Sequence, residues 1–200
     1  MTEHYFSSSP GADSSPRTVR FRLDGRDLEM ASDRSVFSAD RLDPGTRVLL
    51  TEAPRARGGV LLDLGCGYGA IACVNALRAP SAQVWAVDVN ERALRLAAGN
   101  AEAWGVADRV HVCLPDGVPL GETFDEIWSN PPIRIGKQEL HSLLLRWLPR
   151  LRPDGVAWLV VAKNLGSDSL HRWLGEQGWD VERHTSARGY RVLKVRHGSR

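Results

Sequence analysis

The sequence lacks the features that place a protein in a membrane or send it out of the cell. Its longest uninterrupted apolar run, Val156 to Ala162, is far shorter than the ~18–20 residues that a helix needs to cross a bilayer. Residues 1–17, MTEHYFSSSPGADSSPR, have neither a basic start nor an apolar core, so they do not have the pattern of a secretory signal. We therefore expect a cytoplasmic protein without a membrane partner.

Cysteine is scarce, and its occurrences form no motif. Cys66, Cys73 and Cys113 are odd in number, and no two of them have the CxxC spacing of zinc and redox sites. This usage indicates reduced thiols and offers no disulfide framework. We expect no structural metal.

The carboxyl-terminal part of the chain lacks acidic residues, although the net charge of the whole chain is only +2. After Glu182 the only charged side chains are Arg183, Arg188, Arg191, Lys194, Arg196 and Arg200. A second basic cluster contains Arg134, Lys137, Arg146, Arg150 and Arg152. Such clusters can neutralise the phosphates of a nucleic acid, but a solvated basic surface has the same composition. Charge alone leaves both readings open.

The composition that remains is that of a globular protein. The chain has 200 residues, of which 42% are hydrophobic and 25% charged, which suits one domain with additions. Residues 1–17 are rich in Ser, Pro and Gly and are expected to be flexible. Residues 18–50 are predicted to form an extension of a hairpin and a helix, because Thr18 to Met30 alternates in polarity around Asp24-Gly25, a dipeptide typical of a type I′ turn. Residues 51–200 are predicted to form the main domain.

The rhythm of the sequence changes at Val60. From there, short β-branched runs alternate with stretches of helical periodicity, which predicts βα units and a parallel, Rossmann-like sheet covered on both faces. A buried strand is expected at Val156 to Ala162. The last two predicted strands, Asp180 to His184 and Tyr190 to Val195, are separated only by a short turn, so they should form an antiparallel pair.

A glycine-rich turn follows the first strand of this domain, in the sequence DLGCGYG from Asp63 to Gly69. Glycines at such a place allow a tight turn whose backbone amides approach a ligand. Asp88 follows the second strand, where an acid that binds a ribose diol is found in folds of this type. Asp63 would repel a pyrophosphate, so it suits a cofactor with cationic groups, such as S-adenosylmethionine, better than NAD. Alternatively, the two carboxylates only cap the turn and the following helix.

Three segments together resemble a known family. The stretches VLLDLGCGYGAIA, AVDVNERALRLAAGNA and SNPPIRIGK are similar to class I S-adenosylmethionine-dependent methyltransferases. More narrowly, the chain resembles the small methyltransferase domain of 16S ribosomal RNA guanine-N2 methyltransferases and their single-domain relatives. The resemblance also includes Asp43-Pro44-Gly45-Thr46, Lys163-Asn164-Leu165-Gly166-Ser167 and Arg188-Gly189-Tyr190.

The resemblance carries expectations about fold, cofactor and partner. It implies a seven-stranded sheet whose last strand is antiparallel, with residues 51–200 as the methyltransferase domain. It implies S-adenosylmethionine as the cofactor and ribosomal RNA, or the small ribosomal subunit, as the partner. The cofactor-binding residues that it implies are Asp63, Gly65, Cys66, Gly67, Asp88, Val89, Asp116, Gly117 and Asn130.

The Asn-Pro-Pro segment can also be interpreted chemically. An exocyclic amine on a nucleobase is a poor nucleophile, because its lone pair is delocalised into the ring. The side-chain oxygen of Asn130 and the carbonyl of Pro131 can accept its two N–H groups and direct the lone pair toward a methyl group. Pro132 stiffens the loop, so that the acceptors are oriented before the substrate binds. We predict direct displacement at the sulfonium methyl without a metal.

Ile133 departs from the pattern of many enzymes with this chemistry, in which an aromatic residue follows the prolines. An aliphatic contact then replaces stacking on the base, or an aromatic side chain from elsewhere, such as Phe37, supplies it. Arg134, Lys137 and Lys163 are candidates for contacts with substrate phosphates, although each also suits a solvated surface.

Three functions remain open at this point. The first is methylation of guanine N2 in ribosomal RNA. The second is N-methylation of a glutamine side chain in a protein such as a release factor, which uses the same Asn-Pro-Pro chemistry. The third is an inactive module that binds the cofactor and RNA, against which the presence of Asp63, Asp88 and Asn130 argues.

Overall fold

The computed structural model describes residues 15–34, 36, 40–133 and 136–198 of the 200-residue chain. Its strands are β1 (Pro16–Leu23), β2 (Arg26–Asp33), β3 (Val60–Leu64), β4 (Gln83–Val87), β5 (Val110–Cys113), β6 (Phe124–Ser129), β7 (Leu151–Ala162), β8 (Trp179–Ala187) and β9 (Tyr190–His197). Its α-helices are α1 (Pro44–Glu52), α2 (Ala70–Arg78), α3 (Glu91–Ala103), α4 (Lys137–Trp147) and α5 (Ser167–Glu176).

Seven of the strands form one sheet in the order β5-β4-β3-β6-β7-β9-β8. Neighbours from β5 to β7 are parallel, whereas β9 is antiparallel to both β7 and β8. The predicted seven-stranded sheet with an antiparallel last strand is therefore confirmed. Because the first five strands in this order are parallel, their carboxyl ends lie along one edge of the sheet, where ligands bind in open α/β folds.

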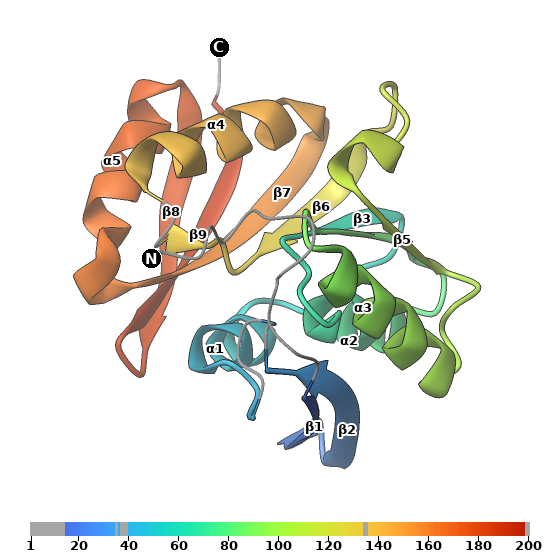
Figure 1. Ribbon diagram of the computed structural model, residues 1–200. Coiled ribbons are helices and arrows are strands. Elements are labelled where there is room, and N and C mark those ends of the chain that lie inside the picture. The colour runs from blue at the N-terminus through green and yellow to red at the C-terminus, as the bar shows by residue number, and fades with distance from the viewer. Residues whose placement is uncertain (1–14, 35, 37–39, 134–135, 199–200) are drawn as a thin grey trace.

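Helices cover both faces of the sheet (Figure 1). α1, α2 and α3 pack on one face around a buried cluster that includes Leu49, Cys73 and Trp128. α4 and α5 pack on the other face, where Leu144 and Leu174 are fully buried. Burial of apolar side chains on both faces explains why the inner strands read as nearly continuous apolar runs.

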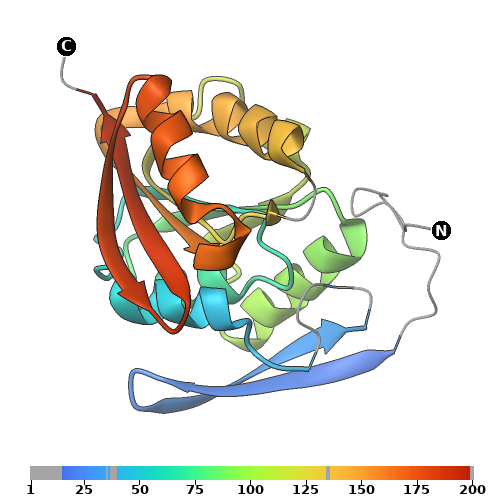
Figure 2. The ribbon, with the colours of Figure 1, turned by 90° about the vertical axis from the view of Figure 1, so that its left-hand side faces the viewer.

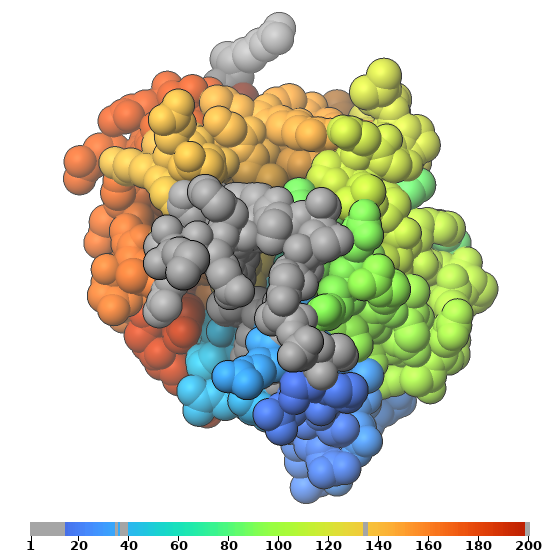
Figure 3. Space-filling model, in the orientation of Figure 1, coloured from blue at the N-terminus to red at the C-terminus, as the bar shows by residue number. Residues whose placement is uncertain are grey.

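The predicted N-terminal hairpin is present as a separate two-stranded sheet of β1 and β2. Asp24 and Gly25 both have positive φ angles, 52° and 76°, as a type I′ turn requires. The hairpin lies along the outside of the helical layer, beside α3 (Figures 2 and 3). Asn100 of α3 connects them, because its Oδ1 accepts from the N–H of Ala31 and its Nδ2 donates to the Ala31 carbonyl, at 2.8 and 2.9 Å.

β7 begins earlier than the sequence pattern predicts. The strand starts at Leu151 rather than Val156, because Leu151 pairs with Phe124 of β6 across an irregular stretch. Gly155 is needed there, since a Cβ atom at this position would lie 3.0 Å from the carbonyl oxygen of Phe124.

In the part of the chain that the structure describes, no helix combines the length and apolar character needed to cross a membrane.

Candidate active site at the carboxyl edge of the sheet

The glycine-rich turn connects β3 to α2 at the carboxyl edge of the sheet. The backbone N–H groups of Gly65 and Cys66 donate to the carbonyl of Val87 at the end of β4, at 2.9 and 3.0 Å. Gly65, Gly67 and Gly69 all have positive φ angles. Gly69 also allows close packing, because a Cβ atom there would lie 3.0 Å from the Cβ of Ala97 on α3. The turn therefore needs glycine for both its conformation and its packing.

Asp63 lies beneath this turn and is 1% exposed. Its Oδ2 accepts from the backbone N–H of Ala72 at 2.9 Å, whereas its Oδ1 accepts from none of the residues that the structure describes. Burial, and to a lesser extent the nearby Asp88, raises the pKa of Asp63 to about 8. A buried carboxylate oxygen without a donor is costly unless a ligand pairs with it. The site therefore fits a cofactor that presents a cationic N–H donor.

Asp88 connects the glycine-rich turn to the start of α3. Its Oδ2 accepts from the N–H of Gly67 and its Oδ1 from the N–H of Asn90, both at 2.9 Å. Burial raises the pKa of Asp88, and hydrogen bonds from the backbone of Asn90, Gly67 and Val89 oppose the shift. A carboxylate has about four acceptor positions, so Asp88 keeps capacity to accept from a ribose hydroxyl.

Asp116 and Gly117 follow β5 at the same edge, in a short 3₁₀ turn. The carboxylate of Asp116 points to Arg146 of α4, at 2.7 Å, and its side chain is 93% exposed. Gly117 allows a close approach, because a Cβ atom there would lie 2.9 Å from the Cβ of Cys113. The role of these two residues at an adenine stays a prediction.

Asn130 begins the loop after β6, and its amide is held in one orientation. Nδ2 donates to Oδ1 of Asp43 at 2.6 Å and to Oγ1 of Thr46 at 3.0 Å. A carboxylate can only accept, so the amide nitrogen must face Asp43. The Asn130 Oδ1 then faces away from Asp43. Asp43 and Thr46 belong to the family resemblance, but the sequence offered no signal for this contact between residues 87 positions apart.

The prolines bring the same loop against the glycine-rich turn. A Cβ atom on Gly65 would lie 4.0 Å from Cδ of Pro132, so the two segments are neighbours. The Pro131 carbonyl accepts from the N–H of Ile133 at 2.8 Å. One lone pair of that carbonyl remains for a substrate. The Ile133 side chain is partly buried against the α4 and α5 side of the core.

The candidate substrate residues are only partly placed by the structure. Lys137 is the first residue of α4 and Lys163 follows β7, and both are exposed. Phe37 and Arg134 lie outside the described residues.

Tyr190 is an aromatic residue at this edge that the sequence argument did not select. Its ring lies against the start of α1, since a Cβ atom on Gly45 would be 2.9 Å from Tyr190 Cε1.

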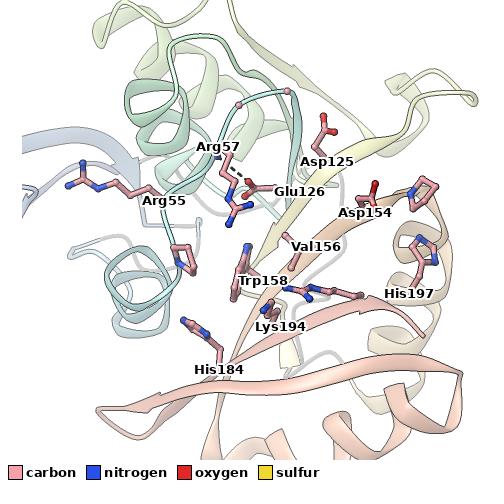
Figure 4. A pocket seen from close by; sticks show the side chains of 16 residues that line it. Arg55, Arg57, Asp125, Glu126, Asp154, Val156, Trp158, His184, Lys194 and His197 are labelled. Atoms are coloured by element: carbon pink, nitrogen blue, oxygen red, sulfur yellow. Dashed lines mark hydrogen bonds between the residues drawn. The ribbon is translucent and has the colours of Figure 1, made fainter. Parts of the chain in front are cut away.

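A cavity of about 590 Å³ lies at the opposite end of the sheet (Figure 4). Arg57, Glu126, Trp158, His184 and Lys194 are among its lining residues. Glu126 is satisfied there, because it accepts from the Arg57 N–H at 3.1 Å and from the Trp128 Nε1–H at 2.8 Å. Since none of the predicted site residues lines this cavity, it is separate from the candidate active site.

The parallel sheet with its antiparallel β9, the glycine-rich turn flanked by Asp63 and Asp88, and the Asn-Pro-Pro loop together define a class I methyltransferase fold. A family model described as the methyltransferase small domain matches residues 27–194. The chain belongs to this family, as the sequence resemblance predicted.

Three curated relatives match most of this chain. The "uncharacterized protein YbxB" of Bacillus subtilis (strain 168) is 36% identical over 98% of this chain and 99% of that protein. Ribosomal RNA large subunit methyltransferase G of Pseudomonas putida (strain W619) is 34% identical over 96% of this chain and 52% of its own length. Ribosomal RNA small subunit methyltransferase C of Hahella chejuensis (strain KCTC 2396) is 38% identical over 80% of this chain and 50% of its own length.

Among solved structures, the T. thermophilus 16S rRNA N2-guanine methyltransferase RsmC, in complex with S-adenosylmethionine and guanosine, has a TM-score of 0.73 and 25% identity. The match covers 94% of this chain and 52% of that chain. This chain thus spans about half the length of the named ribosomal RNA methyltransferases that it matches.

Proposed function

We propose that this protein transfers a methyl group from S-adenosylmethionine to an exocyclic amine, the N2 of a guanine in ribosomal RNA. The observation that carries the proposal is the orientation of Asn130. Its Nδ2 donates to Asp43 and Thr46, so its Oδ1 is the atom available to accept from a substrate amine. This acceptor stands at the end of β6, beside the glycine-rich turn.

The residues that would hold the cofactor follow from the geometry of the turn. The Oδ1 of Asp63, which has no donor among the described residues, would accept from the amino group of S-adenosylmethionine, and the carboxylate of Asp88 would accept from a ribose hydroxyl. Backbone groups of Gly65, Cys66 and Gly67 would approach the cofactor closely, with Val89, Asp116 and Gly117 lining the adenine. The bound cofactor supplies an electrophilic methyl group on its sulfonium.

The chain's own residues would then prepare the amine for direct displacement. Asn130 Oδ1 accepts one N–H, and the remaining lone pair of the Pro131 carbonyl accepts the other. This pairing favours a pyramidal nitrogen with its lone pair directed at the methyl carbon. Pro131 and Pro132 keep the loop rigid, which lowers the entropic cost of alignment. Mutations of a single hydrogen-bonding group of this kind typically reduce kcat by about 10²–10³-fold.

Ribosomal RNA is favoured as the substrate by the names of the relatives. RsmC of T. thermophilus is named as a 16S rRNA N2 methyltransferase, and its structure contains guanosine. The curated relatives from Pseudomonas putida and Hahella chejuensis are ribosomal RNA methyltransferases. Lys137 and Lys163, together with Arg134, would contact RNA phosphates or the small ribosomal subunit. A cytoplasmic location is part of the same proposal.

The proposal is tested by incubating the protein with labelled S-adenosylmethionine and one of three acceptors: unmethylated small ribosomal subunits, naked 16S rRNA or release factors. We expect label in RNA, and N2-methylguanosine after nuclease digestion and mass spectrometry. Label in a release factor instead would replace this proposal with methylation of a glutamine side chain. Cofactor binding without any label would favour an inactive module.

The variant Asn130→Ala examines the role of that side chain. We expect it to abolish turnover while the affinity for S-adenosylmethionine, measured by calorimetry, stays close to that of the wild type. Gln177→Ala, an exposed substitution after α5, should change neither quantity. If Asn130→Ala loses turnover and cofactor affinity equally, the assigned role is wrong.

A further inference from the structure

Asp43 combines two tasks that are usually separate. It is the N-cap of α1, where its Oδ1 accepts from the backbone N–H of Thr46 at 2.9 Å. The same oxygen accepts from Nδ2 of Asn130 at 2.6 Å. One carboxylate oxygen therefore connects the first turn of a helix to the proposed acceptor for the substrate amine.

We propose that Asp43 is a positioning residue for methyl transfer, which keeps the Asn130 amide turned so that its oxygen, and not its nitrogen, meets the substrate. The inference rests on the proposed function, because it concerns how Asn130 faces the acceptor amine. It assigns no contact between Asp43 and the substrate or the cofactor.

The orientation of Asn130 needs such a residue. The last torsion of an Asn side chain is broad and roughly two-fold, so the amide can turn by about 180° at little intrinsic cost. Turned the wrong way, Asn130 would present N–H groups to an amine that also presents N–H groups. The backbone around it is already held, since Ser129 Oγ donates to the Leu64 carbonyl at 2.7 Å and Pro131 restricts Asn130 to extended conformations. The side-chain torsion is the freedom that remains.

A carboxylate is well suited to control that torsion. Asp43 cannot donate when ionised, so only the nitrogen of Asn130 can face it. Thr46 supplies a second acceptor through Oγ1, at 3.0 Å from Nδ2. Nδ2 of Asn130 therefore has two partners at the N-terminus of α1.

The helix that carries Asp43 is itself fixed. Val48, Leu49 and Leu50 of α1 are fully buried in the core. Its first turn also packs on β9, because Gly45 leaves room for the ring of Tyr190. A positioning group on a rigid, packed element can hold its partner to within a few tenths of an ångström. The arrangement suits a device that orients Asn130 before any substrate arrives.

The test separates positioning from helix capping through two substitutions at one position. Asp43→Ser keeps a good N-cap for Thr46, but its shorter side chain does not extend to Asn130. Asp43→Asn keeps an oxygen acceptor for both partners. We expect Asp43→Ser to lower kcat by about 10–100-fold, equivalent to about 1.4–2.7 kcal/mol, with the KM for S-adenosylmethionine unchanged and the melting temperature within about 3 °C of the wild type. Asp43→Asn should stay within about threefold of wild-type kcat.

A matched control and a second measurement complete the experiment. Asp108→Ser removes an exposed carboxylate far from Asn130 in sequence and should leave kcat unchanged. The side-chain ¹⁵NH₂ resonances of Asn130, assigned by their loss in Asn130→Ala, report its hydrogen bonds without any turnover. They should shift and exchange faster with solvent in Asp43→Ser, and remain near their wild-type positions in Asp43→Asn.

The outcomes for this inference differ from those for the function itself. A wild-type protein that methylates no RNA overturns the proposed function. In that case, the Asn130 side-chain resonances in the Asp43 variants still test whether Asp43 orients the Asn130 amide. Unchanged kcat and unchanged resonances in Asp43→Ser overturn the role of Asp43 alone. If Asp43→Ser and Asp43→Asn lose kcat to the same extent, and the melting temperature falls strongly in both, Asp43 acts only as a structural helix cap. This result also overturns its role as a positioning residue.

Discussion

Binding of S-adenosylmethionine should tighten as pH rises from 6 to 8, because Asp63 must lose a proton to pair with a cationic ligand. In the protein without ligand, burial raises the pKa of this carboxyl to about 8. Its Oδ1 has no donor among the described residues, so nothing in that part of the chain compensates a negative charge on this atom. The cofactor's amino group would supply the missing donor and favour the carboxylate.

The magnitude follows from the titration of one group. With a pKa of about 8, roughly 1% of Asp63 is ionised at pH 6 and half at pH 8, so the apparent affinity should rise about 50-fold between these values and level off above them. Near pH 7, binding should release about 0.9 proton per site. Calorimetry in two buffers with different ionisation enthalpies measures both the affinity and the proton release.

Asp63→Asn serves as the control, since it keeps the shape and an acceptor for Ala72 but cannot ionise. We expect weaker binding at pH 8 and little change in affinity between pH 6 and 8. The pKa of Asp88 is also raised, so any slope that remains would be assigned to that residue. Equal affinity of the wild type at pH 6 and 8, or the same slope in Asp63→Asn, would refute the reasoning.

The remaining predictions concern stability. Without the cofactor, the free energy of unfolding should fall as the pH rises from about 4 to 8. The pKa of Asp63 is raised in the folded state, so in this range the folded protein binds more protons than the unfolded chain. Asp63→Asn should flatten this pH dependence when the free energy is measured by urea denaturation. Gly69→Ala should cost more than about 1 kcal/mol because φ is 87° and Ala97 is in the way, whereas Gly99→Ala, which has open space inside α3, should gain about 0.8–1 kcal/mol. Trp128→Ala should cost about 3–5 kcal/mol, measured in the same assay, since the side chain is fully buried. S-adenosylmethionine at 100 times its Kd should stabilise the wild type by about 2.7 kcal/mol, visible as a higher melting temperature.

Local patterns predicted much of the fold. The turn at Asp24-Gly25, the antiparallel β8 and β9 pair and the strand after Val60 all occur where sequence places them, because turn residues and apolar alternation act over a few neighbours. The start of β7 was mispredicted, since Pro153-Asp154-Gly155 has the composition of a turn. Pairing of Leu151 with Phe124 in the folded sheet overrides that local preference.

For the candidate site, too, the sequence identified some of the residues but not the contacts that they make. The carboxylates Asp63 and Asp88 could be selected from the sequence, because an acid in the last residues of a predicted parallel strand, or directly after it, must lie near the carboxyl edge. Their partners could not. Asp116 pairs with Arg146 on a helix of the other layer, and the Pro131 carbonyl accepts from Ile133 within a turn that no pattern announces.

By itself, then, the sequence determined the order of strands and helices and the chemistry available at one edge of the sheet, since both depend on residue types at short spacings. Only the tertiary structure decided which groups meet. Asn130 faces Asp43 because α1 packs beside the end of β6. Oδ1 of Asp63 has no donor among the described residues, because the N–H groups of Gly65 and Cys66 in the turn above it donate to Val87 instead. Hydrogen bonds between residues so distant in the chain depend on packing and strand register, which no local pattern encodes.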